Sequence, residues 1–138
     1  MSALYEKDFT AWAKDQASLL KNKDFAHLDF AHWLKEIEDM GNSHPQAMES
    51  HLNIALIHML KQKYQPDYAS KSWQDSIDNA RVQIADIKEN HPSLRNHLAG
   101  RLEYVYAKSK RYASKQTGIE TKDFSKECPW TLNEILGD

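Results

Sequence analysis

The segment Leu52–Leu60, with the sequence LNIALIHML, decides the fold of this 138-residue chain. On a helix, Leu52, Leu56 and Met59 share one face, and the two isoleucines lie on the opposite side. A helix that is apolar around most of its circumference is usually surrounded by other elements. We therefore expect this segment to lie in a central helix that its neighbours cover.

Five segments carry the apolar period of a helix, and none carries the sustained alternation of a strand. The predicted helices cover residues 8–20, 29–40, 43–65, 72–89 and 93–116. Asp8 and Asp29 are natural caps for the first two helices. Gly41 is expected to end the second helix. The run Ser43-His44-Pro45-Gln46 reads as a capping box that opens the third helix, with proline tolerated in its first turn.

Two of these helices carry well-defined stripes. Trp73, Ile77, Ala80, Ile84 and Ile87 recur at alternating steps of four and three, which is typical of a seam that packs along a neighbour at about 20°. If Trp73 belongs to the core, deleting its ring should cost about 3–5 kcal/mol. The fifth helix has a stripe made by Leu94, Leu98, Leu102, Val105 and Tyr112.

The remaining predictions concern Gly100 and the tail. Gly100 falls inside the fifth predicted helix, where a close approach of another backbone would explain it. The tail of residues 119–130 is expected to be extended, with Phe124 and Trp130 as apolar anchors. Thr131 and Glu134 form a second capping box for a short final helix.

The sequence thus predicts an all-α fold in a single domain over residues 1–138. Because the connections are short, we expect a compact antiparallel bundle of about five helices, an extended C-terminal tail and a short final helix. The chain contains 41% hydrophobic residues, one cysteine and a formal net charge of −2. One cysteine allows no disulfide framework, and no apolar run approaches the about 20 residues of a membrane span. These features predict a cytoplasmic protein without a membrane segment.

One segment is basic within this mildly acidic chain. Residues 95–115 contain Glu103 as their only acidic residue, against six Lys or Arg residues. Arg101, Lys108, Arg111 and Lys115 are therefore candidates for nucleic-acid binding. They are interleaved with Tyr104, Tyr106 and Tyr112, and tyrosines stack on bases. Lys110 projects far from Lys108 and Arg111, Tyr112 lies on the predicted core stripe, and the whole chain is not basic. The sequence therefore favours a protein partner over a nucleic acid.

A second group of candidate residues combines acids with a histidine and an arginine. Glu36 and Glu38 flank the stripe of the second predicted helix, His58 flanks that of the central helix, and Arg81 flanks the seam. A buried charge without a partner is costly, so one of the glutamates is expected to pair with His58 or Arg81. The preferred interpretation is an ion pair that sets helix register. The alternative is a general acid–base pair, as in a hydrolase.

Metal and cofactor chemistry lack their usual signals. His44, His51 and His58 are seven residues apart, so neighbours lie about 10.5 Å apart along a helix. Zinc needs nitrogen ligands at about 2.0–2.1 Å, so the sequence predicts no metal site and no cofactor. Cys128 follows Glu127, whose charge opposes thiolate formation, so we interpret it as a packed residue.

Several short landmarks recur in a characteristic order along the chain. They are Asp8-Phe9 with Trp12, Leu34–Gly41, His58–Lys61, Tyr64-Gln65-Pro66, Ser72-Trp73, Arg81 with Ile84, Pro92-Ser93-Leu94, Thr117-Gly118 and Glu127–Thr131. In this order and spacing the chain resembles a bacterial family known as domain of unknown function 29. It departs from the family pattern at Ser109, Gln116 and Ser125, where alanine, glutamate and proline are frequent. The resemblance implies an all-helical fold and offers no catalytic residues to carry over.

Taken together, these features predict a small cytoplasmic protein-interaction module that contacts its partner through a helical face or the tail. Two alternatives come from other functional classes. One is a nucleic-acid-associated protein that uses the basic fifth helix, and the other is a hydrolase built on the acid and histidine cluster. The oligomeric state stays open.

Overall fold

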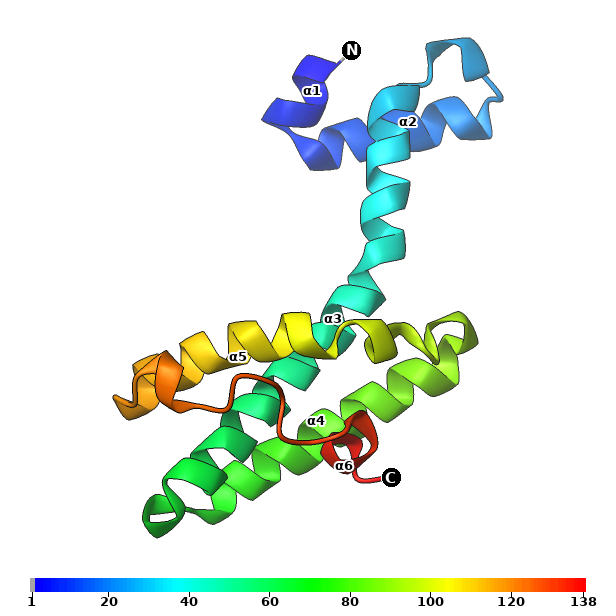
Figure 1. Ribbon diagram of the computed structural model, residues 1–138. Coiled ribbons are helices and arrows are strands. Elements are labelled where there is room, and N and C mark those ends of the chain that lie inside the picture. Colours follow the sequence, from blue (N-terminus) through cyan, green and yellow to red (C-terminus); the bar gives the residue numbers. More distant parts are fainter. Residues whose placement is uncertain (1) are drawn as a thin grey trace. The chain divides into compact units, whose positions relative to one another are not determined.

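The computed structural model describes residues 2–138, and this part of the chain contains helices and no strand (Figure 1). The α-helices are α1 (Ser2–Lys7), α2 (Phe9–Lys21), α3 (Phe30–Tyr64), α4 (Lys71–Asn90), α5 (Leu102–Thr117) and α6 (Leu132–Leu136). Short 3₁₀ turns are η1 (Phe25–His27), η2 (Pro66–Tyr68), η3 (Pro92–Leu94), η4 (His97–Gly100) and η5 (Thr121–Asp123). The all-α prediction is confirmed. None of the described helices combines the length and the apolar character that a membrane crossing requires.

The chain divides into two compact units, with the boundary between Ser43 and His44. The N-terminal unit contains α1, α2, η1 and the first part of α3. The C-terminal unit contains the rest of α3 and all the elements that follow. The assignment of residues 1–138 to a single domain stays a prediction.

The second and third predicted helices are one continuous helix, so the predicted break at residues 41–43 was wrong. Pro45 lies inside α3, where it leaves the carbonyl of Gly41 without its usual N–H donor. The fixed φ of proline is itself helical, so the chain loses one bond and continues. The Ser43 hydroxyl donates to the Met40 carbonyl at 2.9 Å instead of capping a new helix. The poor helix formers of this segment mark the boundary between the units rather than a turn.

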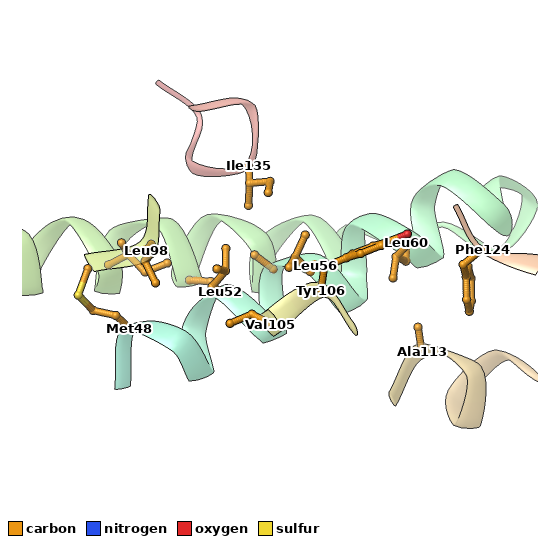
Figure 2. Packing of buried hydrophobic residues seen from close by; sticks show 13 residues of the cluster. Met48, Leu52, Leu56, Leu60, Leu98, Val105, Tyr106, Ala113, Phe124 and Ile135 are labelled. Carbon is orange, nitrogen blue, oxygen red and sulfur yellow. The ribbon is translucent and has the colours of Figure 1, made fainter. Parts of the chain in front are cut away.

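In the C-terminal unit, the second part of α3 is the central helix that the sequence predicted. Its residues Met48, Leu52, Leu56 and Leu60 are completely buried. Figure 2 shows these side chains in a row, with Leu98 contributed from η4, Ile135 from α6, and Val105, Tyr106 and Ala113 from α5. Along the chain, this part of α3, then α4, then α5 run in alternating directions (Figure 1). Ile54, in the same part of α3, has an exposed side chain.

The α4 seam is buried at its middle and open at its ends. Ile77, Ala80 and Ile84 are buried, whereas Trp73 and Ile87 are half-buried. The Trp73 ring lies under the Lys61 ammonium, which is 5.6 Å from the ring centroid. Trp73 therefore lies at the edge of the core. The predicted loss of about 3–5 kcal/mol on deletion of its ring applied only to a core residue, so we do not expect the full loss.

The fifth helix starts later than predicted, because residues 92–100 form two 3₁₀ turns before α5. Gly100 ends the second turn, and no atom lies within 4 Å of the position that a Cβ would occupy. The predicted close backbone approach was therefore wrong. The stripe is also rotated: Tyr106 and Ala113 are buried with Val105, while Tyr112 is exposed.

The tail is held to the C-terminal unit, as the two apolar anchors predicted. Phe124 is buried and meets the Tyr64 ring edge-on at a centroid distance of 4.9 Å, and Trp130 packs against the core. The Tyr106 hydroxyl donates to the Ser125 carbonyl at 2.7 Å. The tail is interrupted by η5, so it is not extended throughout.

The predicted capping box forms at the start of α6, between Thr131 and Glu134. The helix ends at Gly137, whose φ of 78° is the left-handed conformation that favours glycine. Arg81 reaches this end from α4 and donates through Nε to the Ile135 carbonyl at 2.8 Å. A basic side chain at a helix C-terminus satisfies carbonyls that lack helical partners.

The N-terminal unit is organised by polar bonds around two indoles. Gln16 is buried on α2, and its Oε1 accepts hydrogen bonds from the Asp29 backbone and from Trp33 Nε1, both at 2.9 Å. Trp12 Nε1 donates to the Asp29 carboxylate at 3.1 Å. Gln16 therefore lies within the apolar face of α2 as a hydrogen-bond acceptor, and it connects α2 to the start of α3.

Candidate functional site

One face of α5 gathers basic and aromatic side chains. Arg101, Tyr104, Lys108, Arg111 and Lys115 follow each other at steps of three and four residues, so they share one side of the helix. Tyr104 and Tyr112 are 63% and 43% exposed, and the opposite side of α5 is buried. We call these six residues the α5 track (α5 is yellow in Figure 1).

The α5 track lines three adjoining hollows. The first, of about 480 Å³, lies between Arg101, Tyr104 and Lys108 of the track and Glu49 and Ser50 of α3. The second, of about 350 Å³, shares Tyr104 and Lys108 with the first and extends to Arg111 and Thr121. The third, of about 230 Å³, is lined by Arg111, Tyr112 and Lys115. Because each hollow shares lining residues with the next, they are neighbours along α5, and we call this row of hollows the channel.

A charged cluster closes the Arg101 end of the track. Glu49 accepts hydrogen bonds from Arg101 Nη2 at 3.0 Å and from His97 Nε2 at 2.7 Å. Partial burial works against ionisation, but the bonds from Arg101 and His97 outweigh it and hold the pKa of Glu49 below its ordinary value. The Arg101 guanidinium also lies over the Tyr104 ring, 4.1 Å from its centroid. These contacts fix the Arg101 and Glu49 side chains at one end of the channel.

Two other charged groups of α5, Glu103 and Lys110, are held by the backbone of the tail. Glu103, the only acid of α5, accepts a hydrogen bond from the Cys128 backbone at 3.2 Å. Lys110 donates to the Lys126 carbonyl at 3.1 Å and lies over the Tyr106 ring, and its side chain also lines the second hollow. In the described residues, no ion pair or side-chain hydrogen bond involves the three remaining cations, which are Lys108, Arg111 and Lys115.

The structure thus brings together the four residues that the sequence nominated for nucleic-acid binding: Arg101, Lys108, Arg111 and Lys115. It also removes one objection raised from the sequence, because Tyr112 is exposed and lies outside the core. The Lys110 ammonium is bound by the Lys126 carbonyl, so Lys110 is not one of the unpaired cations. The binding role of the four residues stays a prediction.

The predicted acid and histidine cluster is distributed over both units. Glu36 and Glu38 belong to the N-terminal unit, where Glu36 accepts a hydrogen bond from the Tyr5 hydroxyl and Glu38 is exposed. Arg81 belongs to the C-terminal unit, where its acidic partner is Asp78 of its own helix at 3.5 Å. Glu36 and Arg81 thus have partners outside the predicted group, and a catalytic role for the group stays a prediction.

His58 is the member of the cluster with the most unusual environment. Its Nδ1 atom is buried and has no hydrogen-bond partner within the part of the chain that the structure describes. Burial lowers the pKa of His58, and the nearby Lys61 charge lowers it further. A general base is normally oriented by a hydrogen bond to its second ring nitrogen, and none is recorded here.

The sequence did not identify Glu49 and His97, the two residues that form the charged cluster with Arg101. Glu49 directly follows the buried Met48 on α3, so its position beside the core is a signal that the sequence contains. The approach of His97 depends on the η4 turn, which periodicity does not reveal. Over residues 2–138, no group of three or more His, Cys, Asp or Glu side chains is arranged to hold a metal ion. Cys128 packs against the core, and burial raises its pKa, helped by the charges of Glu103 and Glu134.

Comparison with known proteins gives one finding. No match was found among curated proteins or among solved structures. A family model, domain of unknown function DUF29, matches residues 4–138, which is essentially the whole chain. The resemblance in the short landmarks is therefore confirmed, and this chain belongs to the family called domain of unknown function DUF29.

Proposed function

We propose that this chain is a small cytoplasmic protein-interaction module, and that its N-terminal unit binds a basic amphipathic helix of a partner protein. The observation that supports the proposal is the uncovered apolar face of α3. Phe30, Leu34 and Ile37 are 65%, 59% and 57% exposed, and Met40 beside them is 70% exposed. Within residues 2–43, which the structure describes, no element covers these four side chains.

The spacing of the face suits a helical partner. Phe30, Leu34 and Ile37 stand at positions i, i+4 and i+7, the spacing with which helices present anchors to each other. Large apolar side chains that gather on a surface are typical of interaction sites, whereas scattered ones are normal. Three to four anchors correspond to a small contact, so we expect a reversible complex.

Charge indicates which kind of partner fits. Residues 1–43 contain five Lys or Arg residues against eight Asp or Glu residues, and the exposed Glu38 follows Ile37 directly on α3. A second copy of the chain would bring the same negative charge to the contact, which opposes association. A partner helix with basic residues beside its apolar ones is attracted instead. The cytoplasmic placement rests on the composition, which includes only one cysteine.

Designed peptides test the proposal without knowledge of the natural partner. A helical peptide of leucine, alanine and lysine should bind the full chain in calorimetry, and its counterpart with glutamate in place of lysine should not. Leu34→Ser with Ile37→Ser should abolish binding. Val82→Ser is the matched control, because Val82 is 57% exposed but belongs to α4 in the C-terminal unit.

Two results would reject the assignment. Equal binding of both peptides, or binding that survives the double substitution, would remove the charged apolar face as the site. Concentration-dependent dimers in sedimentation that Leu34→Ser dissociates would assign the face to a second copy of the chain.

A further inference from the structure

We propose that the α5 track is a binding site for single-stranded nucleic acid, separate from the apolar face of α3. The juxtaposition that carries this inference is a channel with exposed tyrosines and uncommitted cations in alternation. Proteins that hold single strands combine a positively charged groove with aromatic rings on which bases stack. The α5 track contains both components in one line.

The length of the track matches a short piece of single strand. Arg101 and Lys115 are 14 residues apart, which corresponds to about 21 Å along a helix at about 1.5 Å per residue. Tyr104 and Tyr112 are separated by about two turns, with Lys108 between them on the same face. The order along the channel is therefore base contact, phosphate contact, base contact.

The charges of the channel favour an anion although the whole chain is slightly negative. Glu49 is the carboxylate that lines the first hollow, and Arg101 and His97 bind it. Glu103 is occupied by the Cys128 backbone. Lys108, Arg111 and Lys115 therefore face the channel without a carboxylate to compete with phosphate. Local charge decides the contact here, since interactions between exposed charges are screened beyond about 10 Å at 0.1 M salt.

The shape of the site argues for a single strand over a duplex. A helix that reads a duplex must enter the major groove as a ridge. Side chains of α3 line one part of the channel and Thr121 of η5 lines another, so the face of α5 forms a floor between them. A single strand can lie on such a floor, and its unstacked bases can reach the two tyrosines.

The test measures anisotropy of the full chain with labelled single-stranded RNA and DNA of about 12 nucleotides, over a range of salt concentrations. Each neutralised phosphate of a single strand contributes about 0.7 to the slope of log K against log salt. Three cations predict a slope of about −2. Lys108→Gln alone should reduce its magnitude by about 0.7.

Matched variants separate the track from the general charge of the protein. Lys108→Gln, Arg111→Gln and Lys115→Gln together should weaken binding at least tenfold. Lys63→Gln, Lys71→Gln and Arg95→Gln remove the same charge from exposed positions outside the channel and should leave binding within about twofold of wild type. Tyr104→Leu should weaken it at least about fivefold, whereas Tyr68→Leu, at a 74% exposed ring, should not. Thermal unfolding checks that each variant remains folded.

Three outcomes would overturn the inference. Equal loss in both charge triples would show that only net charge acts. Binding to duplex DNA as tight as to single strands would reject the stacking geometry. Binding of a polyglutamate peptide as tight as that of the oligonucleotide would assign the channel to an acidic protein partner.

Discussion

The two units of this chain use their apolar residues in opposite ways. The C-terminal unit contains every buried apolar residue of the described chain except Trp12. Eight of the exposed large apolar residues lie between Leu4 and Met40, in the N-terminal unit. One unit is thus held by an apolar core, and the other is held by hydrogen bonds at Gln16 and Asp29 and by aromatic rings packed around Trp12. The difference shows that helical periodicity predicts where an apolar face lies but does not predict whether another element buries that face.

The largest expected effect contrasts one leucine from each unit. Leu56→Ala should lower the free energy of unfolding by about 2–5 kcal/mol, because the side chain is fully buried and leaves a cavity. Leu34→Ala makes the same chemical change at an exposed position and should cost no more than about 0.5 kcal/mol. Urea denaturation of both variants checks the pair. Similar costs would mean that the N-terminal unit has a core that the exposures do not reveal.

The next prediction concerns the polar network of the N-terminal unit. Gln16→Leu leaves the Asp29 backbone N–H and Trp33 Nε1 without their acceptor, and we expect a cost of about 1–3 kcal/mol. Hydrogen exchange should accelerate in residues 5–40 and stay unchanged in the C-terminal unit. Gln116→Leu, at an exposed position on α5, is the control. Uniform acceleration along the whole chain would contradict the separate stabilisation of the two units.

A smaller effect is expected at the tail contact of the C-terminal unit. Tyr106→Phe removes the donor to the Ser125 carbonyl and should cost about 1–2 kcal/mol, whereas Tyr104→Phe should stay within about 0.5 kcal/mol. Burial raises the pKa of Tyr106, with further contributions from Tyr64, Cys128 and Glu103. The folded state therefore holds this proton more tightly than the unfolded state. The resulting stability is fully present below about pH 10 and is lost as the pH rises above it. Denaturation between neutral and alkaline pH should show this loss in the wild type and not in Tyr106→Phe.

The smallest effect is expected at His58 in mild acid. Its pKa is lowered in the folded state, so folding favours the neutral ring. Stability is then fully present above the ordinary histidine pKa of about 6.5 and declines as the pH falls below it. His58→Gln should flatten the stability profile between about pH 7 and pH 5. Lys61→Gln should reduce the slope, since the Lys61 charge is one cause of the shift. An unchanged slope in both variants would show that another group dominates the acid response.

Helical periodicity was enough to predict most of the helices, because it depends only on residues that are close together in the sequence. The steps of four and three in Ile77, Ala80 and Ile84 were enough to find the buried side of α4. The errors occurred where a local signal, such as a helix cap or an apolar stripe, was overridden by contacts with residues further along the chain. Gly41 was predicted to end one helix and Ser43 to cap the start of the next, yet α3 continues through both and through Pro45. Tyr112 lay on the expected stripe of α5, but the 3₁₀ turns before the helix and the tail beyond it bury Tyr106 instead.

The candidate site divides in the same way. The four basic residues of the track were identified from the sequence, since they stand in one basic segment. That these residues share one face of the helix became clear only when the structure showed where α5 starts. Their availability needed the contacts that occupy Glu103 and Lys110, which come from tail residues at least sixteen positions away.

By itself, the sequence determined that this protein is helical, that residues 52–60 belong to a central helix of what proved to be the C-terminal unit, and that its family is domain of unknown function DUF29. Each of these follows from patterns within short windows, where one residue type can be compared with the next. Only the tertiary structure decided which apolar faces are covered and which charges remain without partners. Burial and pairing depend on residues that are distant in the chain, and the free energy of a contact is realised only when folding brings both sides together.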